Sequence, residues 1–272
     1  LLPLKWKANM ASRTMEITPP IGVIGGIGPQ AGLDFVQKIF ANTRVSKDQD
    51  HVNCVLISCP SIIPDRTAFL LQNDGKIENP AFGMFECARR LYMAGIRVAV
   101  VACNTAHSDR IFNPFCAMVK ESLPDLIIVN MLKTCAEYIK ETLRVTRVGL
   151  LATKGTHKSR VYHEYLDAEE NFELMEPEAQ GRERVHEAIY SEEYGIKAYS
   201  QEIKPQARDL VSREIDRLID QGAEAVILGC TELPLAIKSR DFAIPVIDPG
   251  LLVARKLIEL TAPEKLTKYG TC

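Results

Sequence analysis

Strand-sized apolar segments alternate with longer amphipathic segments along most of the chain. The apolar segments are rich in β-branched residues, which is typical of strands that are buried on both faces. The amphipathic segments carry apolar residues at helical spacing, and several end at a glycine, such as Gly95 or Gly222. This alternation predicts an α/β fold with parallel sheets covered by helices. The predicted strands are residues 21–24, 54–58, 98–102, 127–129, 148–152 and 225–228, and the predicted helices include residues 31–43, 81–94, 131–143 and 205–221.

The chain also contains an internal repeat with a constant offset of 127 residues. The segment RLYMAGIRVAVVAC, which ends at Cys103, aligns without a gap with RLIDQGAEAVILGC, which ends at Cys230. The same offset relates Gly22 to Gly149, so the shared register extends over more than 80 residues. We therefore expect two pseudo-symmetric domains that share one topology.

The repeat suggests where the domains begin and end. We expect residues 19–120, together with about 245–272, to form the first domain and residues 121–244 to form the second. Residues 1–18 are predicted to be a tail or the remnant of a leader. Lys5, Lys7 and Arg13 precede the first acidic residue, so the remnant of an organellar presequence is the alternative.

The repeat places Cys103 and Cys230 at the ends of equivalent strands. Ligands of open parallel sheets gather outside the carboxyl ends of the strands. If the two halves face one another, both thiols converge on one cleft from opposite sides. Inversion of a carbon stereocentre needs a base on one face and an acid on the other, and a thiolate and a thiol can fill these two roles.

Polar residues follow both cysteines, and a glycine-rich turn follows the first predicted strand. Asn104 and Thr105 come after Cys103, and Thr231 and Glu232 come after Cys230, so each strand ends in small polar groups that can bind a carboxylate. In the turn GGIGP, the backbone N–H groups of Gly26 and Ile27 can approach an anion closely. The turn lacks the G-x-G-x-x-G spacing of a dinucleotide site, so no nucleotide is expected.

The net charge and the length of the apolar runs limit the kinds of molecule that the protein is expected to bind. The 33 Lys and Arg residues and 35 Asp and Glu residues give a formal net charge of -2, without a basic field for nucleic acid. No apolar run approaches the roughly 20 residues that span a bilayer. We expect no nucleic-acid partner and no membrane association.

The number and spacing of the cysteines indicate the cellular compartment of the protein. Eight cysteines occur without any C-x-x-C pair, which favours a reducing compartment and argues against a structural zinc site. The expected location is the cytoplasm, or an organelle if residues 1–18 are the remnant of a presequence. The cysteines other than 103, 230 and 272 are interpreted as small core residues.

Four motifs carry a resemblance to a known family. VVACNTAH (residues 100–107) and GCTELP (residues 229–234) resemble the two cysteine signatures of the aspartate/glutamate racemase superfamily. IPDRTAFLL (residues 63–71) and AIYSEEYGIKA (residues 188–198) are similar to its amino-acid racemase branch. The resemblance extends over about residues 20–260. It implies two Rossmann-like domains with an active site in the cleft between them, a C-terminal segment that returns to the first domain, and a homodimer or higher homo-oligomer.

The resemblance also implies roles for individual residues. Cys103 and Cys230 would be the catalytic acid/base pair, and Asn104, Thr105 and Thr231 would bind the α-carboxylate and amine of the substrate. Arg66 and Lys197 match positions that hold a second carboxylate in aspartate-preferring relatives. This assignment is chemically sensible, because an Arg fork and a Lys point charge together suit a dianion.

These observations predict an amino-acid racemase that uses no pyridoxal phosphate, metal or nucleotide, with aspartate or glutamate as substrate and a D-amino acid as product or substrate. Other two-cysteine enzymes of the superfamily stay open as alternatives, namely dimethylsulfoniopropionate lyase, maleate isomerase and hydantoin racemase. A catalytically silent amino-acid binding protein is a further alternative.

Overall fold

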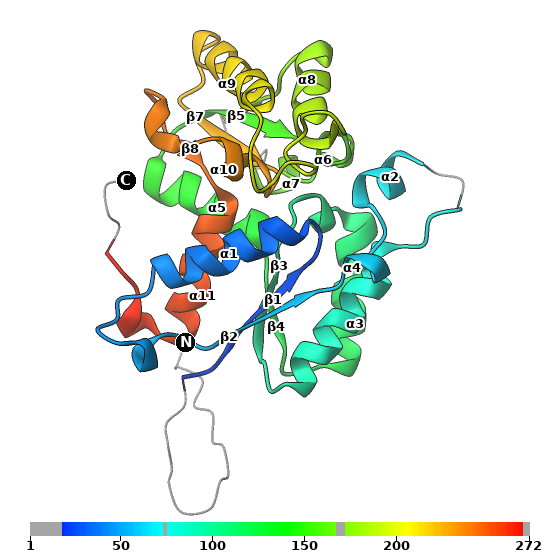
Figure 1. Cartoon of the computed structure of the whole chain (residues 1–272), viewed down its shortest axis with the longest axis vertical. Coiled ribbons are helices and arrows are strands. Elements are labelled where there is room, and N and C mark those ends of the chain that lie inside the picture. The colour runs from blue at the N-terminus through cyan, green and yellow to red at the C-terminus, as the bar shows by residue number, and fades with distance from the viewer. Residues whose placement is uncertain (1–17, 73–74, 167–171, 269–272) are drawn as a thin grey trace, which may run out of the picture.

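The computed structural model describes residues 18–72, 75–166 and 172–268. Two four-stranded parallel sheets, each with its own helices, lie one beyond the other along the longest axis of the molecule (Figure 1). The predicted α/β fold with two parallel-sheet domains is confirmed. The tail or leader predicted at residues 1–18 lies outside the described residues except for its last residue.

The two sheets have the same strand order. It is β2-β1-β3-β4 in the first sheet and β6-β5-β7-β8 in the second, and every neighbouring pair is parallel. Ile21 pairs with Val98 in the first sheet, and Val148 pairs with Ala225 in the second, so the offset of the repeat is kept in the strand register. The strands are β1 (Ile21–Gly25), β2 (Cys54–Ser58), β3 (Val98–Val101), β4 (Ile127–Val129), β5 (Arg147–Ala152), β6 (Glu173–Met175), β7 (Ala225–Gly229) and β8 (Val246–Ile247).

Several helices begin where the sequence carries a proline or a capping side chain. Proline occupies the first helical position of α1, α3, α9 and α11, where its missing N–H has no partner to lose. Asp248 caps α11 by accepting hydrogen bonds from two backbone N–H groups. The helices are α1 (Pro29–Ala41), α2 (Arg66–Leu71), α3 (Pro80–Met93), α4 (Asp109–Ser122), α5 (Met131–Tyr138), α6 (Lys154–Ser159), α7 (His163–Leu166), α8 (Ala179–Tyr190), α9 (Pro205–Asp220), α10 (Leu233–Ala236) and α11 (Pro249–Thr261).

The remaining helical segments are short. The π-helical segment η4 continues α5, so the helix predicted at residues 131–143 is present but changes type at Ile139. The short segments are η1 (Asp48–Asp50), η2 (Pro60–Ile62), η3 (Thr105–His107), η4 (Ile139–Leu143), η5 (Ser239–Asp241) and η6 (Pro263–Lys265).

The repeat is visible in the turns that lead into β3 and β7. Gly95 and Gly222 have φ angles of 87° and 94°, a left-handed conformation that glycine adopts without the strain a Cβ would cause. The residue after each glycine donates a hydrogen bond back to the equivalent leucine of the preceding helix, at 3.0 and 2.9 Å. Both central strands therefore start from the same turn geometry.

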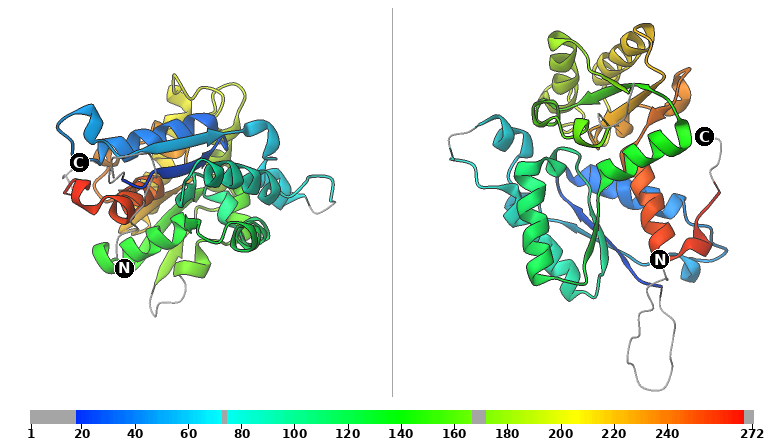
Figure 2. Two further views of the ribbon diagram at one scale, coloured as in Figure 1. Left: turned by 90° about the horizontal axis from the view of Figure 1, so that it is seen from below. Right: turned by 180° about the vertical axis from the view of Figure 1, so that it is seen from behind.

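The C-terminal helix α11 packs on α1 and α5 beside the first sheet (Figure 2). One hydrophobic cluster contains Val100 of the first sheet, Ile227 of the second and Leu257 of α11. The two domains therefore share part of their core, which holds the carboxyl ends of both sheets in place.

The domain limits themselves stay a prediction. By strand membership, the first sheet extends to Val129 rather than to about residue 120, and the second includes Ile247, beyond residue 244. Of the cysteines interpreted as core residues, Cys87 and Cys135 are buried, whereas Cys54, Cys59 and Cys116 are half-buried and pack at the edges of the clusters.

Candidate active site

Cys103 and Cys230 each lie just beyond the carboxyl end of the central strand of their sheet. Both are buried. The hydroxyl of Thr231, next to Cys230, donates a hydrogen bond to the backbone oxygen of Ala102, next to Cys103, at 3.5 Å. The two strand ends therefore meet, as the repeat predicted, although the catalytic roles of the two cysteines stay predictions.

On the Cys103 side, the guanidinium of Arg66 lies against the sulfur. Arg66 begins α2, which is capped by Asp65 and packs against α6 of the second domain. Its Nη2 donates to the backbone oxygen of Ile27 at 3.2 Å. Burial alone would lower the pKa of Arg66, but the neighbouring groups Cys103, Asp65 and Tyr190 outweigh it and raise the pKa. Arg66 is thus a fixed cation beside Cys103.

His107 is a structural residue on the same side. Its Nε2 accepts a hydrogen bond from the N–H of Met131 at 3.4 Å, so the ring proton is on Nδ1, which donates to the backbone oxygen of Cys103 at 2.8 Å. Complete burial lowers the pKa of His107 to about 4, against which the hydrogen bond acts weakly. The neutral ring holds the main chain at Cys103 and brings no charge to its sulfur.

On the Cys230 side, the side chain of Glu232 is the main feature. The thiol of Cys230 donates to Glu232 Oε2 at 3.0 Å, and the hydroxyl of Thr231 reaches the same oxygen at 3.3 Å. The other oxygen, Oε1, accepts from the ammonium of Lys197 and from the N–H of Gly28 at 3.3 Å. Lys197 therefore faces a carboxylate of the protein, and does not point freely into the cleft.

These contacts set the charge states around Cys230. Burial raises the pKa of the Cys230 thiol well above its usual value. The charge of Glu232 raises this pKa further, and the charge of Lys197 offsets only part of the increase. Burial would also raise the pKa of Glu232, but Lys197 and the hydrogen bond from Cys230 lower it. For Lys197, burial lowers the pKa and Glu232 raises it, with a net increase. The site thus holds a carboxylate, an ammonium and a neutral thiol.

Four threonine hydroxyls are hydrogen-bonded to one another at a second contact between the two domains. Thr105 Oγ1 lies 3.1 Å from the hydroxyl of Thr153 and 2.8 Å from that of Thr156, and Thr67 donates to Thr153 at 3.3 Å. Thr67 and Thr105 belong to the first domain, whereas Thr153 and Thr156 belong to the second. Thr105, predicted to bind substrate, is already engaged in joining the two domains.

Two buried donors near the cysteines have no hydrogen-bond partner within the part of the chain that the structure describes. They are Arg66 Nε and Asn104 Nδ2. The Asn104 oxygen is engaged, because the hydroxyl of Tyr162 donates to it at 2.6 Å. Buried donors without partners are costly, and these two are therefore available to acceptor oxygens.

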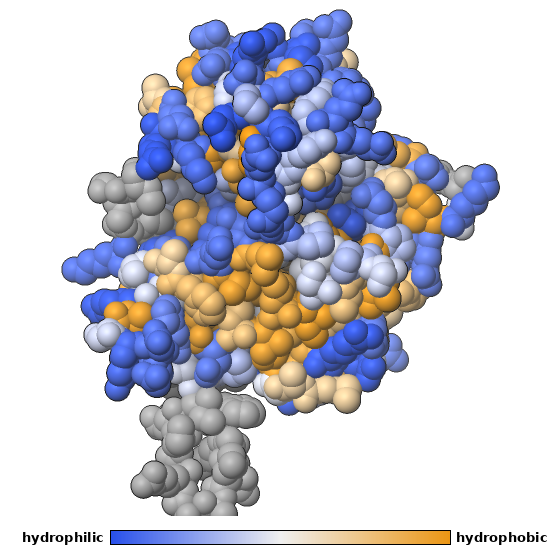
Figure 3. All heavy atoms as spheres, viewed as in Figure 1, coloured by the Kyte–Doolittle hydropathy of each residue, from blue (hydrophilic) through white to orange (hydrophobic). Residues whose placement is uncertain are grey.

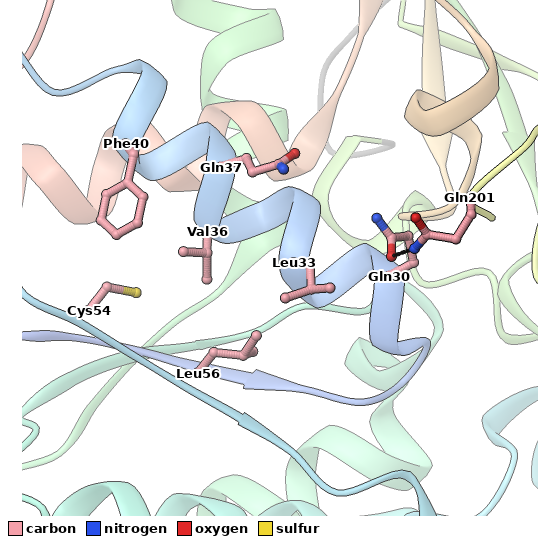
Figure 4. A pocket seen from close by; sticks show the side chains of 8 residues that line it. All are labelled: Gln30, Leu33, Val36, Gln37, Phe40, Cys54, Leu56 and Gln201. Atoms are coloured by element: carbon pink, nitrogen blue, oxygen red, sulfur yellow. Dashed lines mark hydrogen bonds between the residues drawn. The ribbon is translucent and has the colours of Figure 1, made fainter.

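A cavity of about 340 Å³ opens beside this charged cluster. It is lined by Gly28, Pro29, Gln30, Ala31, Lys197, Ser200, Gln201 and Glu232. The side chains of Gln30 and Gln201 are hydrogen-bonded across its edge, so α1 of the first domain touches the segment after α8 of the second (Figure 4). The cavity size is within the range of small-molecule sites, and Lys197 and Glu232 form its polar end.

A second cavity of about 630 Å³ continues from the same glutamine pair along α1 and β2, and is lined by Gln30, Leu33, Val36, Gln37, Phe40, Cys54, Leu56 and Gln201 (Figure 4). None of these residues is charged. It belongs to an apolar area over α1 and β2 on the face shown in Figure 3, where Leu33 is 50% and Phe40 is 40% exposed.

Gly26 and Ile27 were predicted to bind substrate through backbone N–H groups. Both are buried in the turn after β1, but the N–H group with an identified acceptor is that of Gly28, and Ile27 contributes its backbone oxygen to Arg66. Sequence reasoning did not select Gly28, and it indicated Glu232 only as a polar group after Cys230; the structure brings the two residues into contact.

The residues that the structure describes contain no group of three or more His, Cys, Asp or Glu side chains that could hold a metal ion. Among the same residues, no helix is long and apolar enough to cross a membrane.

A family model described as Asp/Glu/Hydantoin racemase matches residues 24–257. The chain belongs to this family. It is 23% identical to the broad specificity amino-acid racemase RacX of Bacillus subtilis, over 88% of this chain and 96% of that protein.

Two solved structures have a fold similar to that of this chain. The aspartate racemase of Picrophilus torridus superposes with a TM-score of 0.71 at 28% identity, with 89% of this chain and 93% of that chain covered. An aspartate racemase homologue from Pyrococcus horikoshii gives a TM-score of 0.68 at 27% identity, with coverage of 90% and 100%. The predicted family membership is confirmed, whereas the residue roles, the substrate and the oligomeric state stay predictions.

Proposed function

We propose that this protein is an amino-acid racemase that inverts the α-carbon with Cys103 and Cys230 and without a cofactor. The observation that carries the proposal is that two buried cysteines lie just beyond equivalent strand ends, and that these strand ends are joined by the hydrogen bond from Thr231 to Ala102. One sulfur would remove the α-hydrogen while the other returns a proton to the opposite face. The family match and the names of the racemases it resembles support this reaction class.

The proposed substrate is aspartate or glutamate. Arg66 Nε and Asn104 Nδ2 are buried donors without partners in the described structure, and substrate carboxylates would supply the missing acceptors. Neutralisation of the α-carboxylate also assists removal of the weakly acidic α-hydrogen. Lys197 contributes less than the resemblance implies, because Glu232 already neutralises it. Arg66 is therefore the main carboxylate-binding residue of the proposal.

The test is incubation with separate L- and D-amino acids in D2O, followed by proton NMR and chiral chromatography. We expect loss of the α-hydrogen signal together with appearance of the opposite enantiomer, first for aspartate or glutamate. An alkene or a volatile sulfide as product would instead indicate one of the related lyases or isomerases. Binding without hydrogen exchange would indicate an amino-acid binding protein, and both results would contradict the proposal.

A further inference from the structure

Cys103 and Cys230 are equally accessible but lie in different electrostatic surroundings. Their exposed fractions are 6% and 5%, and the same strand end of the repeat carries both. The position two residues after the cysteine is Thr105 in the first half and Glu232 in the second. Only the second half therefore places a carboxylate beside its thiol.

Titratable residues from several elements of the second domain face Cys230. Glu232 accepts the thiol hydrogen, and Lys197 approaches the same carboxylate from the segment after α8. Tyr190 at the end of α8 and Tyr162 after α6 also face the sulfur, and burial keeps both hydroxyls neutral by raising their pKa values. Glu232 is thus the one anion among the groups that the structure identifies beside Cys230.

The groups that the structure identifies around Cys103 differ from those around Cys230. Arg66 lies against its sulfur, His107 is neutral, and Thr105 offers a hydroxyl that is bonded to the second domain. Each sulfur has a cation nearby, Arg66 for Cys103 and Lys197 for Cys230. A carboxylate that accepts the S–H hydrogen stabilises the thiol, and the structure shows such a bond at Cys230.

We propose that Glu232 is a positioning residue that holds the proton on Cys230, so that in the free protein Cys230 is the thiol of the pair. Lys197 keeps Glu232 ionised and in place, and the N–H of Gly28 fixes the carboxylate from the first domain. The asymmetry is built into the sequence by the replacement of a hydroxyl by a carboxylate at equivalent places of the repeat.

This inference rests on the proposed function for its chemical meaning. In the first turnover, the α-carbon–hydrogen bond breaks and its proton forms the S–H bond of Cys103. The S–H bond of Cys230 breaks and its proton forms the new bond to the α-carbon on the opposite face. Cys230 is then a thiolate beside Glu232, a repulsive arrangement that favours its reprotonation.

The test measures thiol reactivity and needs no substrate. The folded protein is treated with iodoacetamide over a range of pH, and alkylation of Cys103 and Cys230 is followed by peptide mass spectrometry. Since only the thiolate reacts and the two exposed fractions are nearly equal, we expect Cys103 to react at least roughly tenfold faster than Cys230 at pH 7. Equal rates, or a faster Cys230, would overturn the proposal without affecting the proposed racemase activity.

The variant Glu232→Gln sharpens the test. The glutamine oxygen can still accept from Lys197 and Gly28, while its amide nitrogen donates to the sulfur of Cys230 in place of the acceptor. We expect the alkylation of Cys230 to accelerate by roughly tenfold at pH 7, while that of Cys103 stays unchanged. The matched control is Glu192→Gln, which removes an exposed carboxylate and should change neither rate.

Two further readouts separate this role from a merely structural one. In an active enzyme, the alkaline limb of the pH dependence of kcat reports loss of the Cys230 proton, and Glu232→Gln should move it to lower pH. If Glu232→Gln fails to fold, Glu232→Asp withdraws the carboxylate and should also accelerate Cys230 alkylation. An unchanged Cys230 rate in a folded Glu232 variant would overturn the proposal.

Discussion

Thr105 and Glu232 lie at equivalent positions of the repeat and contact equivalent turns of the opposite domain. Glu232 accepts a hydrogen bond from the N–H of Gly28, in the turn after β1, at 3.3 Å. Thr105 is hydrogen-bonded to Thr153, which follows β5, and to Thr156 in the first turn of α6, at 3.1 and 2.8 Å. The contacts between the domains thus follow the pseudo-symmetry, while the charges that they place beside the cysteines do not.

The hydrogen bonds of Thr105 and Glu232 join the two domains. The residues that hold the domains together are the neighbours of the proposed acid and base, so the same contacts set the separation of the domains and the protonation of the sulfurs. A substitution at one of these positions should therefore change thiol reactivity as well as stability.

The first prediction concerns the two cysteines. Cys103→Ser and Cys230→Ser should each lower racemisation by roughly 100-fold or more, because a serine hydroxyl is a poor base and a poor acid near neutral pH. Chiral chromatography measures the effect, and circular dichroism checks the fold. Cys54→Ser, at a half-buried cysteine of β2, is the matched control and should keep full activity. Full activity in either active-site variant would exclude the two-base mechanism.

Cofactor independence gives a second prediction. Activity should survive dialysis against EDTA and the protein should show no absorbance of a pyridoxal aldimine, because two thiols suffice for both proton transfers. Racemisation assays before and after dialysis, and after treatment with iodoacetamide, measure this. Loss of activity on chelation combined with resistance to iodoacetamide would show that a metal carries the chemistry.

The third prediction concerns Arg66. Arg66→Ala should lower kcat/KM for aspartate or glutamate by roughly tenfold more than for a neutral amino acid, because only the dianion loses a charge-assisted hydrogen bond. Steady-state kinetics of hydrogen exchange on both substrate types measure the ratio. Arg240→Ala, at an exposed position of η5, is the control. An equal decrease of kcat/KM for acidic and neutral substrates would mean that Arg66 interacts with the α-carboxylate, which both substrates share, or only with Cys103.

The sequence predicts the central part of each domain well. Apolar runs predict β1, β2, β3, β4, β5 and β7 to within a residue at each end, because each of these strands consists mostly of apolar residues, many of them β-branched. The repeat places Cys103 and Cys230 correctly at the ends of equivalent strands, since a constant offset fixes equivalent positions in two related folds.

Other parts lack a sequence signal. β6 has three residues, the first of them the charged Glu173, and β8 has only two, so neither forms a recognisable apolar run. Lys197 and Glu232 are 35 residues apart on different elements, and periodicity carries no information on such a pair. Their ion pair depends on how the segment after α8 folds back onto the end of β7, which only the tertiary structure defines.

The fourth prediction concerns the stability of this ion pair. Removal of one partner of a buried pair leaves the other charge uncompensated, so Lys197→Met should cost roughly 3–5 kcal/mol in the free energy of unfolding. The double variant Lys197→Met/Glu232→Gln should recover part of this loss. Urea denaturation measures both. Additive effects of the two changes would mean that the pair does not interact energetically.

The pH dependence of the same pair follows from the pKa directions. The pKa of Glu232 is lowered by folding, so its contribution is present above the ordinary value of 4.5 and is lost as the pH falls through the folded value. The pKa of Lys197 is raised, so its contribution is present below 10.5 and is lost as the pH rises through the folded value. The difference in stability between the wild type and Lys197→Met should therefore be largest between about pH 5 and 10.

The last prediction concerns Gly28. A side chain at this position would meet the carboxylate of Glu232. A Cβ at this position would lie 2.7 Å from Glu232 Oε1 and 3.6 Å from Lys197 Nζ. The φ angle of -83° is acceptable for alanine, so Gly28→Ala acts through this contact and not through its own φ angle. It should push Glu232 away from Cys230, accelerate Cys230 alkylation in the same direction as Glu232→Gln, and lower racemisation.

The control for Gly28→Ala is the same change in a Glu232→Ala background, where the shortened side chain no longer meets the new methyl group. If the contact with Glu232 is the cause, Gly28→Ala should have little further effect there on unfolding free energy or on Cys230 alkylation, because coupled changes are not additive. An equal effect in both backgrounds would place the cause in the turn after β1, and the proposed link between Gly28, Glu232 and the protonation of Cys230 would then fail.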